Sequence, residues 1–160
     1  MSDPVIAPFK QEFDRFHEYL RQLIDACPNE AVWLEKNGSI AYWQHLMHTF
    51  ACMEYYTLPV GAPRKQTRYP EDVVRFKAEP DSPMTQDEVR SLAKDMHILV
   101  HEYMARQNAQ TLTQINESVL QILGRECSNL QALITLVRHA TYHLGCCDAI
   151  LRSHGLPGVH

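Results

Sequence analysis

The sequence lacks the features that would place it in a membrane or on a nucleic acid. No apolar run approaches the roughly 18 residues that a membrane-spanning helix needs. Residues 1–10 contain no basic segment followed by an apolar core, so no signal peptide is expected. The net charge is −4, and no basic stripe stands out that would follow a phosphate backbone. We therefore expect a protein with neither a membrane nor a nucleic acid as its partner.

Glycine and cysteine are too few and too irregularly spaced for several common sites. The six glycines form no P-loop, no dinucleotide-binding fingerprint and no GxSxG nucleophile motif. The five cysteines are odd in number and show no CxxC spacing, which argues against a disulfide framework or a cysteine-rich zinc site. Reduced thiols in a cytoplasmic protein fit this pattern best.

The remaining composition is that of an ordinary globular protein. Hydrophobic residues make up 45% of the 160 residues and charged residues 21%. A chain of this length can bury a substantial core without disulfides or metals. We expect one domain that covers residues 1–160.

Four long segments carry apolar residues at the 3.6-residue spacing of a helix. The first runs from Phe9 to Cys27 and the second from Ser39, as a candidate N-cap, to Leu58; a proline follows each. The third begins at a capping box of Thr85 and Glu88, and the fourth at a box of Ser128 and Gln131. No alternation typical of β-strands competes with these patterns. The sequence therefore predicts an all-α four-helix bundle.

The connections between these helices differ in character. Residues 59–83 contain five prolines and predict a long connection between helices two and three, either a crossover or a lid. Residues 31–36 predict a short turn with Trp33 and Leu34 directed inward. Residues 111–123 predict a shorter amphipathic helix that ends at Gly124.

Three histidines in the predicted helices form a candidate metal site. His139 and His143 are four residues apart, so they share one helix face with Cβ atoms about 5–6 Å apart. If helices two and four pack face to face, His48 meets this pair. Three neutral imidazoles leave one coordination position vacant, as catalytic metals require. His45, one turn before His48, is the competing third ligand.

Other histidines and thiols leave alternatives open. His97 and His101 have the same four-residue spacing on helix three, near Asp95 and Glu102, and form a second candidate pair. His17, His154 and His160 are expected to be solvated. Ligation by Cys146, with Cys52 as a further candidate, is the alternative that would close the first site into a structural one. Glu54 follows His48 by six residues and so points to a different part of helix two, which disfavours it as a general base.

Two motifs resemble those of the DinB-like (DinB/YfiT) superfamily. Residues 43–50 (WQHLMHTF) are similar to its helix-two motif, in which a tryptophan precedes a metal-binding histidine. Residues 138–145 (RHATYHLG) are similar to its helix-four motif, with two histidine ligands and a glycine, and residues 150–155 also resemble its tail. The sequence departs from the pattern at Cys146, where glutamine is frequent in the family, and at His45, which adds a second histidine to helix two.

The resemblance implies a fold, a ligand set and a range of activities. It implies a four-helix bundle in which His48, His139 and His143 hold a divalent metal ion, with zinc expected first and nickel or iron as the other choices. Members with assigned activities are mostly thiol S-transferases, with one thiol-dependent isomerase, that use low-molecular-weight thiols, and members are often homodimers. We therefore expect a cytoplasmic, homodimeric metal-dependent thiol S-transferase acting on a small molecule. A metal-dependent hydrolase and a non-catalytic metal-binding dimeric module are the alternatives.

Overall fold

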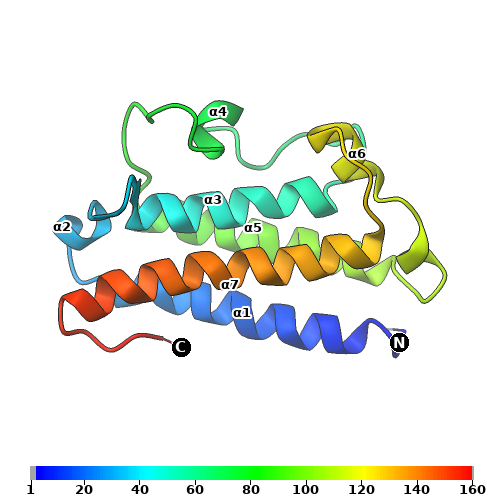
Figure 1. Cartoon of the computed structure of the whole chain (residues 1–160), viewed down its shortest axis with the longest axis horizontal. Coiled ribbons are helices and arrows are strands. Elements are labelled where there is room, and N and C mark those ends of the chain that lie inside the picture. The colour runs from blue at the N-terminus through cyan, green and yellow to red at the C-terminus, as the bar shows by residue number, and fades with distance from the viewer. Residues whose placement is uncertain (1–2, 160) are drawn as a thin grey trace.

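Four long helices, packed side by side, make up most of the computed structural model, which describes residues 3–159 (Figure 1). They are α1 (Ala7–Ala26), α3 (Tyr42–Thr57), α5 (Gln86–Ala105) and α7 (Asn129–Ser153). Both α1 and α3 pack against α5 and α7. The predicted all-α bundle is therefore confirmed, and α3 and α7, which carry the candidate ligands, are in direct contact.

Side-chain caps begin two of these helices, as the sequence predicts. Thr85 accepts from the backbone N–H of Glu88, whose side chain accepts from the backbone N–H of Thr85. Ser128 and Gln131 form the same reciprocal pair at the start of α7. These bonds satisfy backbone donors that have no partner inside the helix, and so define where each helix starts.

Helix α3 is the most buried of the four long helices. Every one of its residues except His48 is buried. A helix that is apolar over most of its circumference is expected to be enclosed on all sides. The one partly open position on α3 therefore coincides with a candidate metal ligand.

A small hairpin replaces the expected start of helix two. Strands β1 (Lys36–Asn37) and β2 (Ile40–Ala41) pair antiparallel around Gly38, whose φ of 70° is the left-handed value that glycine adopts without cost. The prediction that Ser39 caps the helix is wrong, because α3 begins after Ala41, and Gln44 accepts from the Ala41 N–H at 2.8 Å. A two-residue strand is too short to show an alternating pattern in the sequence.

The short helix α2 (Glu30–Trp33) partly matches the turn expected before this hairpin. Trp33 is buried as predicted, and its indole N–H donates to the carbonyl oxygen of Met84 at 2.7 Å. Leu34 is 40% exposed, so the prediction that it points inward is wrong.

Short helices in two of the connections lie on the outer side of α3 (Figure 1). The long connection from α3 to α5 crosses over α3 and contains the short helix α4 (Glu71–Val74), as Figure 1 shows. The helix expected over residues 111–123 is divided into a 3₁₀ turn, η1 (Thr111–Thr113), and α6 (Glu117–Leu123), which ends at Gly124 as predicted. Within residues 3–159, no helix is both long enough and apolar enough to cross a membrane.

Candidate metal centre

The structure brings His48, His139 and His143 together between α3 and α7. The Nε2 atom of His139 lies 3.0 Å from Nε2 of His48 and 3.2 Å from Nε2 of His143. One ligand atom from each ring lies within 4.8 Å of the others. Two atoms bound 2.1 Å from one ion are separated by about 3.0–3.4 Å, depending on the coordination angle. The three rings are therefore spaced as ligands of one ion would be.

The tautomer of His48 is determined by a backbone contact. Its Nδ1 lies 2.5 Å from the carbonyl oxygen of Val74, at the end of α4. A carbonyl oxygen can only accept, so Nδ1 of His48 carries the hydrogen and Nε2 carries the lone pair. The lone pair faces His139. A backbone carbonyl that orients the ring in this way is typical of metal-binding histidines.

Burial keeps these imidazoles neutral. It lowers the pKa of His139 to about 4, with the nearby His48 and Arg138 adding to the shift. It lowers the pKa of His143 to about 2, and the three surrounding histidines contribute. The pKa of His48 is also lowered by burial, despite its bond to Val74. Neutral rings have the free nitrogen lone pair that a metal ion requires.

His45 lies behind His143 rather than in the cluster. Its Nδ1 is 2.9 Å from Nδ1 of His143, and its side chain is 2% exposed. Ligation through Nε2 of His143 requires a hydrogen on Nδ1, which His45 would then accept. Nε2 of His45 finds no partner in the described part of the chain. The structure therefore gives His45 the position of an outer partner to a ligand, which the sequence could not distinguish from a ligand.

Two aromatic rings border the cluster. Phe76, which follows α4, packs against His48 with ring centroids 4.3 Å apart, and its φ of 59° is unusual for a non-glycine residue. Tyr142 lies against His143 with centroids 5.0 Å apart and is 64% exposed. Phe76 gives no signal in the sequence, because it lies in a connection without periodicity.

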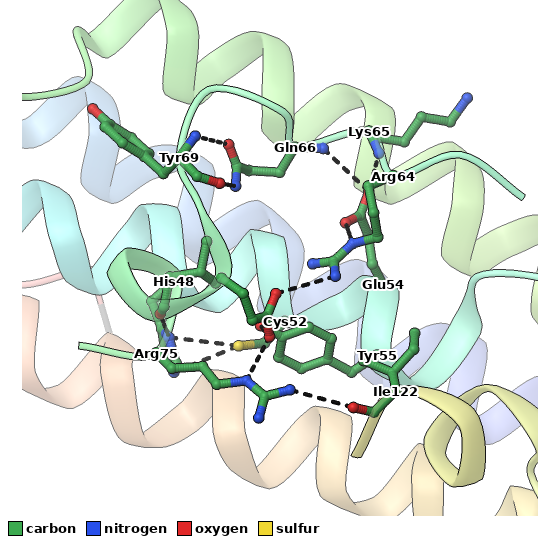
Figure 2. Close-up of polar contacts among 12 residues, drawn as sticks. His48, Cys52, Glu54, Tyr55, Arg64, Lys65, Gln66, Tyr69, Arg75 and Ile122 are labelled. Carbon is green, nitrogen blue, oxygen red and sulfur yellow. Dashed lines mark hydrogen bonds and ion pairs between the residues drawn. The ribbon is translucent and has the colours of Figure 1, made fainter. Parts of the chain in front are cut away.

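Charged residues fix the crossover above the cluster. Glu54 is fully buried in α3 and accepts from the side chain of Arg64 and the backbone N–H groups of Lys65 and Gln66. Figure 2 shows these contacts and the neighbouring guanidinium group of Arg75. Glu54 therefore positions the crossover and does not face the histidines.

Glu71 adds a second attachment point to the crossover. Its carboxylate accepts from the Tyr55 hydroxyl at 2.5 Å and pairs with Arg75 at 2.5 Å and Arg64 at 3.2 Å. Burial raises the pKa of Glu71. The hydrogen bonds from Tyr55 and Arg75 lower this pKa by a larger amount, so the net pKa is below the usual 4.5. Together Glu54 and Glu71 hold the segment that supplies the Val74 carbonyl and the Phe76 ring.

The cysteines do not join the three histidines in a ligand group among residues 3–159. The sulfur of Cys52 lies 3.5 Å from Nδ1 of His48, beside the ring. Burial raises the pKa of Cys52 well above its usual value, so the thiol stays protonated. Cys146 is half-buried on α7, and all five cysteines are unpaired.

Of the histidines expected to be solvated, His17 departs from the prediction and His154 follows it. His17 is 5% exposed and its Nε2 donates to the carbonyl oxygen of Ala93 at 2.8 Å, so the prediction that it is solvated is wrong. His154 is exposed and pairs with Glu35. His97 and His101 meet Asp14 rather than Asp95 or Glu102. His160 lies outside the described residues.

Comparisons with known proteins support the fold. No protein-family profile and no curated protein matches the sequence. Among solved structures, the chain is similar to the crystal structure of a DinB-like protein from Bacillus cereus, with a TM-score of 0.67 and 18% identity over 94% of this chain and 93% of that one. At this identity the likeness concerns the fold alone. The chain has the DinB-like four-helix fold that its two histidine motifs predict.

Proposed function

We propose that His48, His139 and His143 bind one divalent metal ion through their Nε2 atoms. The observation that carries this proposal is the hydrogen bond from Nδ1 of His48 to Val74, which leaves the Nε2 lone pair directed at His139. His139 has a single Nε2, which cannot donate to both neighbouring nitrogens at once. A shared cation satisfies all three nitrogens.

The donor set favours a first-row transition-metal ion, and we propose zinc first. Three neutral imidazoles and no thiolate suit zinc, and also nickel or iron(II), better than magnesium or calcium, which prefer oxygen ligands. The experiment is metal analysis of protein purified without an affinity tag. We expect the wild type to carry an ion at this centre and His143→Ala to contain about one ion per chain fewer. Unchanged metal content in that variant would reject the assignment.

We propose further that the centre is catalytic and transfers a low-molecular-weight thiol to a small electrophilic substrate. A divalent ion held by three histidines keeps a position open for a thiol or water and lowers the pKa of that ligand. The chain itself contributes Phe76, whose ring packs against His48, and Tyr142, whose ring lies against His143. If water rather than a thiol is activated, the reaction is a hydrolysis.

A thiol-consumption assay separates these activities. Purified protein is mixed with several low-molecular-weight thiols and with epoxide or haloarene electrophiles, with and without a chelator. Metal-dependent loss of thiol supports the transferase. Absence of turnover with every thiol, in protein that retains its metal, favours a non-catalytic metal-binding module. We also propose a cytoplasmic homodimer, which sedimentation analysis of the tag-free protein tests.

A further inference from the structure

A second group of metal-ligating side chains lies between α1 and α5, away from the first centre. His97 and His101 occupy adjacent turns of α5, and Asp14 faces them from α1. The two histidines have the four-residue spacing that aligns side chains on one helix face. The sequence could not identify the third member, because Asp14 is 83 residues away from His97 along the chain.

Both histidines point the same nitrogen at one carboxylate oxygen. Oδ1 of Asp14 lies 3.0 Å from Nε2 of His97 and 2.6 Å from Nε2 of His101. Two ligand atoms bound 2.1 Å from one ion are about 3.0–3.4 Å apart, depending on the coordination angle. The His97 contact is at the lower end of this range, and the His101 contact must open by about 0.4–0.8 Å.

The surrounding side chains hold the two imidazoles in place. The ring of Phe13 stacks on His97 and meets the edge of His101, with centroids 5.8 Å apart in both pairs. The buried ring of His17 lies against His97 at 4.6 Å. A site whose ligands lie on rigid, packed helices loses little conformational freedom when it binds.

The group is charged and open to solvent. Burial raises the pKa of Asp14, but the hydrogen bonds from His101 and His97 outweigh it, so the net pKa is below the usual value and the carboxylate is ionised at neutral pH. The side chains of Asp14 and His97 are 44% and 40% exposed. Both line a groove of about 580 Å³ between the two helices, together with Arg21 and Lys94. Positions not taken by the three side chains would therefore be accessible to water or a small anion.

We propose that Asp14, His97 and His101 form a second site for a divalent transition-metal ion, independent of the histidine centre between α3 and α7. Two imidazoles and one carboxylate are the ligands of many open zinc and iron(II) sites. Zinc or another late first-row ion is preferred over magnesium, because two of the three ligands are nitrogens.

Zinc binding to tag-free, chelator-stripped protein tests this proposal. The variant His139→Gln/His143→Gln lacks two ligands of the first centre, so equilibrium dialysis against Zn²⁺ isolates the second site. We expect about one bound ion per chain, lost when Asp14→Asn is added. Asparagine preserves the size of the side chain and its hydrogen-bond acceptor but removes the charge. The two proteins compared therefore differ in the charge of one ligand and not in its shape. Equal zinc binding with and without Asp14→Asn would overturn the proposal.

A second comparison covers the case in which the first variant does not fold. The wild type is expected to bind about two ions and Asp14→Asn/His97→Gln/His101→Gln about one. Identical binding curves for these two proteins would also overturn the second site. A wild type that binds a single ion, and loses it only on substitution of Asp14, would instead support the second site and contradict the first. The two proposals can therefore fail separately.

Discussion

His45 stands behind His143, with the Nδ1 atoms of the two rings 2.9 Å apart. The two histidines come from different helices, α3 and α7, and both are buried. His143 therefore presents one nitrogen to the histidine cluster and the other to His45. This contact joins the candidate centre to the interior of the bundle.

Substitution of His45 should weaken metal binding without removing the site. His45→Leu removes the acceptor behind His143, and loss of such an outer partner lowers affinity about 10–100-fold. His45→Asn places a side-chain oxygen near the position of Nδ1 and should recover part of that affinity. Competition with a chelator of known affinity measures both. Equal affinities for the leucine variant and the wild type would show that His45 does not orient His143.

His48→Asn should distinguish the roles of the two ring nitrogens of His48. The asparagine amide can still donate to the Val74 carbonyl, as Nδ1 of His48 does, but nothing replaces Nε2. We therefore expect a protein that keeps the fold and the crossover contact but loses the ion of the histidine centre. Metal analysis and far-UV circular dichroism check this. A metal content equal to that of the wild type would mean that His48 is not a ligand.

Two substitutions of Phe76 distinguish its backbone from its ring. At a φ of 59° a non-glycine residue is strained by about 1–2 kcal/mol, and glycine is not. Phe76→Gly should therefore be more stable than Phe76→Ala by about 1 kcal/mol in denaturant unfolding of the metal-free protein. Both lose the ring that covers His48, so both should release metal to a chelator faster than the wild type does. An alanine variant as stable as the glycine variant would contradict this backbone conformation.

Glu71→Gln should loosen the crossover in a pH-dependent way. Because the pKa of Glu71 is lowered below 4.5 in the folded protein, its charge stabilises the fold above that pH. This contribution is lost as the pH falls through the folded pKa. At pH 7 the variant should be about 0.5–1 kcal/mol less stable than the wild type, and the difference should shrink as the carboxylate of the wild type is protonated.

Urea unfolding at several pH values measures this difference for Glu71→Gln. Glu79→Gln is the control, because Glu79 is exposed in the same connection. A difference between wild type and Glu71→Gln that stays constant from neutral to acid pH would exclude the carboxylate as its source.

Alanine at Cys52 or Cys146 should leave the metal in place. Among residues 3–159 no thiol groups with the three histidines as a ligand, and burial raises the pKa of the Cys52 thiol. Cobalt-substituted protein should lack the intense absorption of a cobalt–thiolate bond. Such a band, if it disappeared in either alanine variant, would establish a closed structural site in place of the open one.

The helices were predictable because their signals are local. Apolar spacing indicates each long helix, and the capping boxes at Thr85 and Ser128 give two of the starts. The hairpin at residues 36–41 was not predictable, since its strands are only two residues long. The spacing of His139 and His143 predicted a shared helix face, packing of helix two against it predicted His48 as the third ligand, and the resemblance supported the same three residues.

The sequence by itself determined that this chain forms amphipathic helices and that two of them carry histidines able to share an ion. Only the tertiary structure decided which groups surround those histidines. The Val74 carbonyl, the Phe76 ring and the Asp14 carboxylate reach their partners through contacts between segments distant in the chain. Periodicity describes the faces of one helix and carries no information on which face of another segment lies opposite. That choice follows from the packing of the whole bundle.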